Sequence, residues 1–299
     1  MKARRDGHNR AREWLKSEGR GIDLAYTSWI SGGSATVIVN ELLKFQNNDG
    51  GFGHALEPDV RLSGSSVLAT SVALQHASRL DLAASHPVVS GAMQYLSSSF
   101  DAATGLWKLV PDHVDDAPHA PWWGPRKPGD GQLNPRAELL AYYWRWGSEG
   151  IGEKTLDVLT SAVASLIPTS EELEMHEILT IDRLVSEPGL PDHIREGIEA
   201  TFRTAVVDRI GTDPSGWVGY GIAPLSIVKS PNHRLADELS SSIEIQLDQI
   251  EASQQVDGSW IPPWSWFGEY PETWPEAERD IRSFVTADNV GLLSRFGRY

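Results

Sequence analysis

Three short segments of the chain combine carboxylates with histidine, arginine or tryptophan, and these side chains are the ones that could perform chemistry. The first segment, residues 51–63, contains His54, Glu57, Asp59 and Arg61. A carboxyl group buried among apolar side chains has a raised pKa and can act as a general acid. We therefore predict that Glu57 or Asp59 is catalytic and that His54 and Arg61 bind the ligand. The plainer alternative is a loop salt bridge from Arg61 to one of these acids, or carboxylates that stabilise the start of the next helix.

The second segment, residues 111–124, is interrupted by prolines, so it cannot form a long helix and should be a rigid loop. Its acids, imidazoles and paired indoles are His113, Asp115, Asp116, His119, Trp122 and Trp123. Indole faces attract cations and also stack on sugars, so the segment could be an active-site lid. In that case the two acids and His113 would be catalytic, and His119 and the two tryptophans would bind the ligand. The plainer alternative is a structured loop whose indoles cover a rim.

The same segment offers a metal-site hypothesis, because His113, Asp115, Asp116 and His119 are all possible ligands. Their spacing matches no metal motif. We therefore predict neither a metal nor another cofactor.

The third segment, residues 258–274, is a second aromatic loop. Its indoles, at positions 260, 264, 266 and 274, do not have helical spacing. Aromatic side chains on loops commonly line ligand cavities, so Trp264 and Trp266 are predicted to bind the ligand. Packing in the core is the alternative.

Composition excludes several classes of protein. The chain of 299 residues has no cysteine, which rules out disulfides, thiolate zinc sites and cysteine nucleophiles. Its formal charge of −15 disfavours nucleic-acid binding, since phosphates need a basic face. We find no phosphate loop, dinucleotide glycine motif or Gly-x-Ser-x-Gly elbow.

The sequence also predicts no membrane span, because no stretch approaches about 18 uncharged apolar residues. Residues 1–10 have no apolar core behind their charges, so they do not read as a signal peptide. The expected location is the cytoplasm.

A turn motif recurs along the chain. Leu42, Gln46, Gly50 and Phe52 match Ile250, Gln254, Gly258 and Trp260 in type and spacing, and Asp precedes each glycine. Leu96, Gly105 and Trp107 give a third, partial match, and weaker echoes lie at 130–133 and 213–217. Repeats of about 50 residues suit one helical hairpin per unit.

Local physics explains the turn. The aliphatic residue and Gln are four apart, so they share one face at the end of a helix. Gly then ends the helix with a positive φ. The aromatic residue should fold back between neighbouring hairpins, and Gln should hydrogen-bond backbone groups of the next unit.

Helical periodicity fills the space between the turns. Helices are predicted over 35–46, 65–80, 87–99, 135–146, 156–167, 171–185, 192–209, 232–253 and 276–296. Asn134 should cap the fourth of these, with Pro135 at its first position. The fold class is therefore all-α, an α/α toroid of roughly ten to twelve helices in one domain over 1–299. Residues 147–153 are the best alternative boundary, but we do not divide the chain there.

The two matched turns resemble the glutamine–tryptophan repeats of the squalene-hopene cyclase, diterpene cyclase and protein prenyltransferase family. The resemblance implies an α/α barrel of inner and outer helices with a cavity that opens at one end. Prenyltransferases of this family bind zinc through Asp, Cys and His, and this chain has no cysteine. Class II cyclases use an Asp-x-Asp-Asp acid motif and pair two toroids. The nearest string here, residues 112–116, has one residue more between its first two acids, and Phe52 stands where the family has Trp.

The leading hypothesis is a class II terpene cyclase-like enzyme, an isomerase or lyase, that binds an isoprenoid or other apolar small molecule. Its acid would be Glu57, Asp59, Asp115 or Asp116. The alternatives are a glycoside hydrolase or lyase, which would use paired carboxylates and stacked tryptophans, and a non-catalytic binding scaffold. A polar, open cleft would favour the carbohydrate; a closed apolar cavity would favour the isoprenoid. The sequence leaves open whether the protein forms a homo-oligomer.

Overall fold

The computed structural model describes the chain except for residues 1, 125–131, 168–172, 218 and 220. In the described part, helices dominate, and the two short strands β1 (Phe100–Asp101) and β2 (Leu106–Trp107) pair antiparallel. The α-helices are α1 (Lys2–Glu18), α2 (Gly21–Ile30), α3 (Ala35–Leu42), α4 (Val67–Arg79), α5 (Pro87–Ser98), α6 (Arg136–Trp146), α7 (Glu153–Leu166), α8 (Met175–Val185), α9 (Asp192–Ile210), α10 (Pro224–Ile227), α11 (Ser240–Ser253) and α12 (Trp274–Arg295). The all-α prediction is confirmed.

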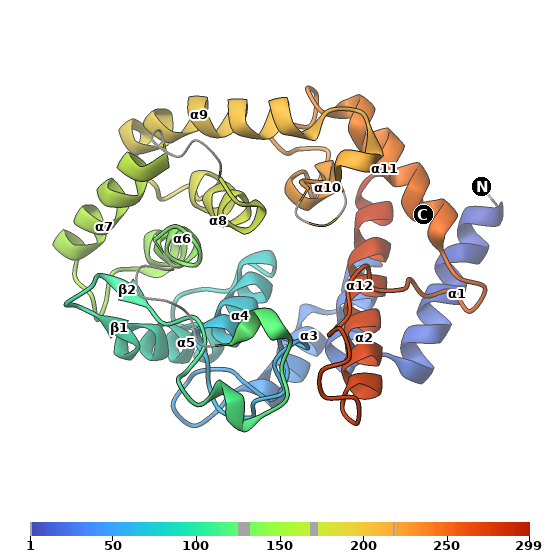
Figure 1. Ribbon diagram of the computed structural model, residues 1–299, viewed down its shortest axis with the longest axis horizontal. Coiled ribbons are helices and arrows are strands. Elements are labelled where there is room, and N and C mark those ends of the chain that lie inside the picture. Colours follow the sequence, from blue (N-terminus) through green and yellow to red (C-terminus); the bar gives the residue numbers. More distant parts are fainter. Residues whose placement is uncertain (1, 125–131, 168–172, 218, 220) are drawn as a thin grey trace.

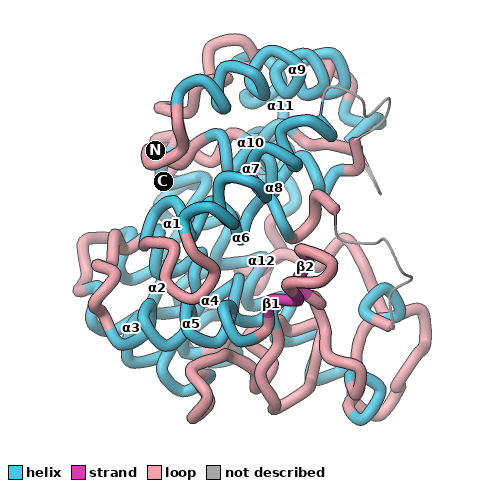
Figure 2. Tube along the Cα trace, turned by 90° about the vertical axis from the view of Figure 1, so that its left-hand side faces the viewer, coloured by secondary structure: helices cyan, strands magenta, loops and turns pink. Residues whose placement is uncertain are grey.

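The helices are arranged in a ring (Figure 1). Figure 1 shows α4, α6, α8, α10 and α12 on its inner side, and α1, α7, α9 and α11 on its outer side. Figure 2 shows β1 and β2 on the side of the ring where long loops gather. Closure into a complete α/α toroid stays a prediction.

Side-chain contacts show how α2, α4 and α12 are oriented relative to one another. Ser283 of α12 accepts from Arg20 N (2.9 Å) and donates to Asp23 in the first turn of α2 (2.7 Å). Further along both helices, Arg295 donates to Tyr26 Oη (2.7 Å), and the Tyr26 ring lies 6.4 Å from that of His76 in α4. Helices α2 and α12 therefore run parallel, and the end of α4 lies beside the ends of both.

The glutamine of the repeated turn behaves alike in both copies. Gln46 Nε2 donates to Gly50 O (3.0 Å), and Gln254 Nε2 donates to Gly258 O (2.9 Å). Gln254 also donates to Gly7 O in α1 (2.9 Å). The predicted bond to the next unit is therefore confirmed for Gln254, because α1 is the helix that packs against α12.

The indoles of the repeats also share one contact. Each Nε1–H donates to a carbonyl near the end of the preceding helix: Trp107 to Leu96 (2.8 Å), Trp217 to Ile210 (2.6 Å) and Trp260 to Ile250 (2.7 Å). Gly105 also has the positive φ of Gly50 and Gly258, so the third match is the same kind of turn. The echo at 213–217 shares the indole contact alone, because Gly216 lies in a short 3-10 helix and lacks the positive φ. The echo at Asp130–Gly131 lies outside the described residues.

Several helix predictions need correction. Helix α6 begins at Arg136, so Pro135 precedes the helix and Asn134 does not cap it. The predicted start of the helix over 171–185 lies outside the described residues; α8 begins at Met175, after a capping box between Glu174 and Glu177. Residues 232–239 form turns, because Arg234 there bonds across to Asp182, Ser186 and Glu199. Helices α1, α2 and α10 were not predicted.

Buried apolar side chains form one large cluster from Ala11 to Leu293. Tyr143 and Leu156 belong to this cluster, and Ile151 packs on it, so the core continues across residues 147–153. A separate small cluster comprises Ala120, Trp266 and Ala277. No described helix is both long and apolar enough to cross a membrane.

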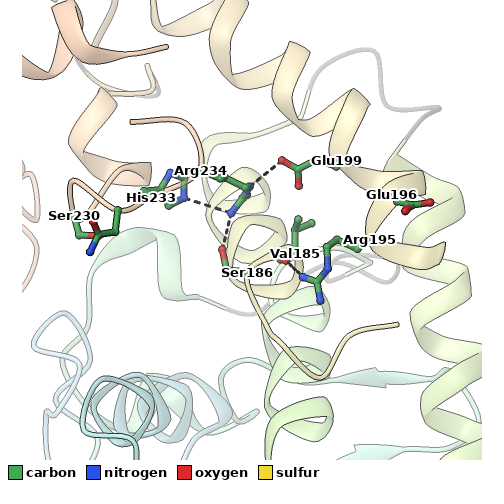
Figure 3. Close-up of a pocket in the computed structure, with 9 residues that line it drawn as sticks. Val185, Ser186, Arg195, Glu196, Glu199, Ser230, His233 and Arg234 are labelled. Carbon is green, nitrogen blue, oxygen red and sulfur yellow. Dashed lines mark hydrogen bonds and ion pairs between the residues drawn. The ribbon is translucent and has the colours of Figure 1, made fainter. Parts of the chain in front are cut away.

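Two hollows lie on the surface. The end of α8, the start of α9 and residues 230–234 enclose about 550 Å³ (Figure 3). Figure 3 shows Arg234 between Ser186, His233 and Glu199, and Arg195 against Val185. A second hollow of about 700 Å³ lies between α1 and α12. Neither is lined by a predicted site residue, and the arginines of the first are already bonded.

The repeated turn predicts a large difference between two glycine substitutions. Gly50 has φ +85°, and a Cβ there would collide with the carbonyl of Gly91 in α5. Gly147 has φ +109°, and a Cβ there would meet open space. Both replacements strain a backbone with positive φ, but only the one at Gly50 also meets a neighbouring backbone. We therefore expect Gly50→Ala to lower the free energy of unfolding by about 1–3 kcal/mol more than Gly147→Ala does. Urea denaturation of both variants measures this, and equal losses would contradict the packing of this turn on α5.

Candidate functional site

The first two predicted segments pack against each other. Arg61 N donates to Pro118 O (2.9 Å), and Ala120 N donates to Asp59 O (2.8 Å). Between these bonds, Val60 and His119 form an antiparallel β-bridge. The backbone on both sides of Asp59 is therefore held by the second loop.

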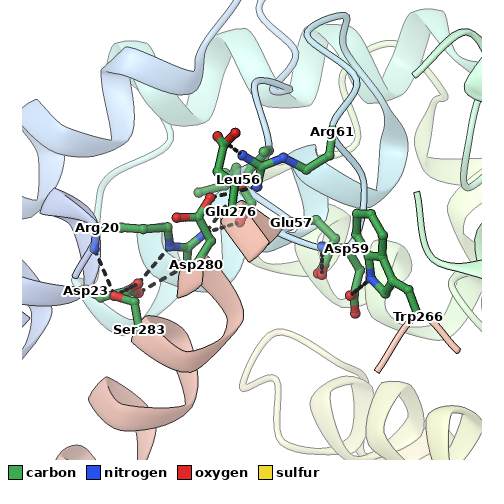
Figure 4. Close-up of polar contacts among 11 residues, drawn as sticks. Arg20, Asp23, Leu56, Glu57, Asp59, Arg61, Trp266, Glu276, Asp280 and Ser283 are labelled. Carbon is green, nitrogen blue, oxygen red and sulfur yellow. Dashed lines mark hydrogen bonds and ion pairs between the residues drawn. The ribbon is translucent and has the colours of Figure 1, made fainter. Parts of the chain in front are cut away.

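The third segment reaches the same place through its indoles. Trp266 Nε1 donates to Asp59 Oδ1 (2.7 Å), and Trp264 Nε1 donates to Asp59 Oδ2 (3.1 Å). Figure 4 shows the Trp266 ring beside this carboxylate. Asp59 is 5% exposed and Trp266 is fully buried. One carboxylate thus joins parts of the chain that lie more than two hundred residues apart.

Burial raises the pKa of Asp59, and the two indole hydrogen bonds oppose that rise. The first effect disfavours the charged form in a poorly solvated place, and the second stabilises the carboxylate directly. Burial is the larger of the two, so Asp59 keeps its proton to a higher pH than an ordinary aspartate does.

Aromatic rings surround this carboxylate. Trp266 lies edge-on to Tyr270 (6.2 Å between centroids) and tilted against Trp274 (5.6 Å). Tyr270 in turn lies 5.7 Å from the buried ring of His119. Trp266 belongs to the small cluster that is separate from the main core, and Tyr270 and Trp274 pack against it. The site therefore has a carboxylate, an imidazole and indole faces in one place.

Glu57 lies next to Asp59 (Figure 4). Its pKa is raised to about 7, first by burial and then by the negative charge of Asp59. The hydrogen bond from Asp59 N to Glu57 Oε1 (3.3 Å) and the charge of Arg20 act in the opposite direction. Close to neutral pH, Glu57 therefore exists in both protonation states.

Arg20 anchors the loop that carries Glu57. Its Nε lies 2.7 Å from Asp23, and its Nη1 donates to Leu56 O (3.1 Å) and Ala55 O (3.3 Å). No functional role was predicted for Arg20. The signal that was present is the spacing of three between Arg20 and Asp23 at the start of a helix, which allows such a pair.

Arg61 pairs with α12 rather than with its own loop. It bonds to Glu276 (2.5 Å) and Asp280 (2.6 Å), so the alternative salt bridge to Glu57 or Asp59 is wrong. Figure 4 shows this pair of contacts on the side of Glu57 away from Trp266. Arg61 therefore tethers the loop to α12, and its predicted role in ligand binding stays a prediction.

The structure separates the remaining candidates. His119 is buried, with Nδ1 3.0 Å from Ala117 O and Nε2 3.4 Å from the exposed carboxylate of Asp115. Asp116 and His113 are exposed on the loop. His54 is also exposed, and its Nε2 lies 2.9 Å from Asn47 Oδ1. Of the acids and histidines predicted in the second segment, His119 alone is buried.

The tryptophan pair of the second loop lies at the edge of the site. Trp122 is 39% exposed, and its ring meets that of Phe267 edge-on at 6.5 Å. Trp123 is half-buried and packs on the small cluster. The two indoles therefore face different surroundings, one solvent and one protein.

No group of three metal-binding side chains is found in the described part of the chain. Of the four residues in the metal hypothesis, Asp115 and His119 are in contact with each other.

A further buried carboxylate, that of Glu138, was not predicted from the sequence. Glu138 of α6 is 3% exposed and is bonded by Ser71 and Gln75 of α4, by Tyr142, and by Arg183 of α8. Its position four residues before Tyr142 was the available signal. Four groups already bond to the Glu138 carboxylate. We therefore interpret Glu138 as a structural residue that connects the inner helices α4, α6 and α8.

Comparison of the chain with protein-family models, curated proteins and solved structures gave no match.

The raised pKa of Glu57 predicts a pH-dependent stability. Between pH 4.5 and about 7 the unfolded chain has released this proton and the folded chain still holds it. Stability must therefore fall as pH rises through this window. Glu57→Gln removes that loss, so relative to wild type it should gain about 3 kcal/mol in free energy of unfolding between pH 4.5 and pH 8. Urea denaturation at both pH values measures the gain, and the exposed-site control Asp116→Asn should show none.

The indole bond to Asp59 predicts a second effect. Trp266→Phe removes a donor to a carboxylate, which should cost about 2 kcal/mol at pH 8. At a pH low enough to protonate Asp59 the loss should shrink, because the donor then serves a neutral group. The side-chain carboxyl resonance of Asp59 should titrate at a higher pH in the variant. Trp122→Phe is the matched control, and an unchanged Asp59 titration in Trp266→Phe would contradict the bond.

Proposed function

We propose that the protein is an acid–base enzyme that cleaves a C–O bond in a carbohydrate-like substrate, as a glycoside hydrolase or lyase does. The observation that carries this proposal is the pair Glu57 and Asp59, two adjacent carboxyl groups in one aromatic site with different surroundings. Glu57 has a pKa of about 7. Burial also raises the pKa of Asp59, but two indole donors, which Glu57 lacks, oppose that rise and stabilise its ionised form. Environments that push two carboxyl pKa values apart assign one group as acid and the other as base.

In this proposal Glu57 is the general acid. It donates its proton to the oxygen of the scissile bond, and Asp59 as the carboxylate accepts a proton from the attacking water or, in a lyase, from carbon. Positive charge that develops on the sugar ring meets the faces of Trp264, Trp266 and Tyr270, which attract cations. Arg20 and Arg61 hold the loop of both acids in place.

Acid strength favours this substrate over an alkene. A general acid works best when its pKa lies near the working pH and the accepting atom is an oxygen base. Protonation of a carbon–carbon double bond needs a stronger acid than usual, because an alkene is a far weaker base than an ether oxygen. A pKa raised to about 7 makes Glu57 a weaker acid than an ordinary glutamate. The acid strength of Glu57 therefore suits protonation of a glycosidic oxygen.

Isoprenoid cyclisation is the second candidate, and one observation favours it. Both Asp59 oxygens accept from indole N–H groups, and such bonds stabilise the anion that remains after proton transfer. An aspartic acid held in this way inside an aromatic cluster could protonate an alkene and shelter the carbocation. In this case Asp59, and not Glu57, would be the acid.

Substrate access requires movement of the loop that covers the acids. Asp59 is 5% exposed, so no substrate reaches it in this conformation. The loop of residues 264–270 has two non-glycine residues in the left-handed region, Phe267 (φ +53°) and Tyr270 (φ +45°). Each such residue stores about 1–2 kcal/mol of strain. We propose that this loop opens to admit substrate and that its indoles return over the bound ligand.

The test uses purified protein with two substrate panels. Chromogenic glycosides and polysaccharides are followed by release of chromophore or reducing ends, and linear prenyl diphosphates and polyenes by mass spectrometry. If Glu57 is the acid, glycoside cleavage should fall as pH rises through about 7, and Glu57→Gln should lower kcat by about a hundredfold or more and remove this limb of the pH profile.

Asp59→Asn should also inactivate the enzyme, whereas the exposed-site control Asp116→Asn should retain full activity. Cyclised products that depend on Asp59 but not on Glu57 would replace the carbohydrate proposal with the isoprenoid one. Turnover in neither panel would contradict both and leave the non-catalytic scaffold.

A further inference from the structure

Three cations converge at the far ends of the inner helices. They are Arg79, the last residue of α4; Lys229, just after α10; and Arg295, the last residue of α12. Lys229 Nζ lies 3.1 Å from Asp288, and Arg295 Nε donates to Lys229 O (2.8 Å). Helices α2, α4, α10 and α12, which carry or flank these residues, are neighbours along the ring (Figure 1).

Tyr26 of α2 links the two arginines. The Arg79 guanidinium lies over its ring, 5.5 Å from the centroid, and Arg295 Nη1 donates to its hydroxyl (2.7 Å). Both guanidinium groups are therefore near one phenol. Their like charges repel, and a cluster of this kind is unfavourable unless negative charge compensates it.

The compensation within the described chain is partial. Asp288 is the carboxylate whose pKa is lowered by Lys229, Arg79 and Arg295 together, although burial opposes this. Neither arginine forms an ion pair with any residue that the structure describes. Of the five N–H groups of Arg295, two donate to the acceptors named above, which leaves three. Arg79 has no hydrogen-bond acceptor among the described residues.

The plainer explanation is that the cations offset the negative ends of α2, α4 and α12. Each helix end carries about half an elementary charge, so three ends balance about one and a half cations. Asp288 balances one more. Three cations therefore leave an excess of about half a positive charge, on a chain whose formal charge is −15. Helix ends alone do not account for the cluster.

We propose that Arg79, Lys229 and Arg295 form a binding site for an oxyanion, the phosphate, sulfate or carboxylate group of a small ligand. The planar guanidinium groups supply the free N–H donors, and such charge-assisted bonds are stronger than neutral ones. Tyr26 keeps both guanidinium groups oriented. Without ligand, Asp288 forms an ion pair with Lys229. A bound oxyanion would compete with Asp288 for this lysine.

This site is distinct from the one that contains Asp59. Ser283, which contacts the Arg20–Asp23 pair, and Arg295 are twelve residues apart on α12, about 18 Å along a helix axis. The oxyanion site is thus at the other end of the inner helices from the acids. Its existence does not depend on the proposed acid–base function.

Isothermal titration calorimetry with inorganic phosphate and with sulfate tests the proposal, at constant ionic strength set with chloride. Wild type should bind both anions. Arg79→Gln and Arg295→Gln should each weaken binding by about tenfold or more. Arg5→Gln, which removes the same charge from an exposed position on α1, should leave it unchanged. Arg79 is exposed, so its variant should fold, and thermal unfolding confirms this.

Asp288→Asn supplies a result of opposite sign. Removing the competing carboxylate should tighten anion binding several-fold, whereas loss of a merely structural ion pair would leave it unchanged or weaker. Titration with glucuronate against glucose then shows whether a carboxylate on a sugar is accepted. No binding to wild type, or equal losses in Arg79→Gln and Arg5→Gln, would overturn the proposal.

Discussion

The buried carboxylate of Asp59 is the constraint on which the site depends. A carboxyl group taken out of water is costly unless donors replace its hydration. Here both donors are indoles from the loop after α11, more than two hundred residues away. The same carboxylate therefore fixes the position of that loop, brings Trp266 against Tyr270 and Trp274, and raises the pKa of its neighbour Glu57. The position of the loop, the aromatic packing and part of the rise in the pKa of Glu57 all depend on this one buried carboxylate.

The sequence predicted those parts of the fold that depend on residues close together in the chain. Asp-Gly and the residue two positions later define a turn within a few residues, so Gly50, Gly258 and their aromatic partners were found from spacing alone. The partial match at Trp107 was also found in this way, and the structure shows that its indole makes the same contact as that of Trp260. Helix α1 was missed for the opposite reason. Its sequence is strongly charged, and contacts from distant residues, such as Gln254 to Gly7, hold it in place.

The candidate site was predicted in its residues but not in its pairings. Glu57, Asp59, His119, Trp264 and Trp266 were all named from composition, and the structure brings them together. Spacing could not show which indole meets which acid, because those bonds cross most of the chain. The partner of Arg61 was wrong for the same reason: α12 presents Glu276 and Asp280 to it, and both lie more than two hundred residues further on. Arg20 and Tyr270 had no motif to mark them.

Helix polarity explains why acids and cations lie at opposite ends of α2, α4 and α12. A helix start carries partial positive charge and a helix end partial negative charge. Asp23 and Glu276 lie in the first turns of α2 and α12, and Arg79 and Arg295 lie in the last turns of α4 and α12. Because α2 and α12 run parallel and end beside the end of α4, these preferences add along the ring instead of cancelling. An acid site near the helix starts and a cationic site at the helix ends are two results of one repeated architecture.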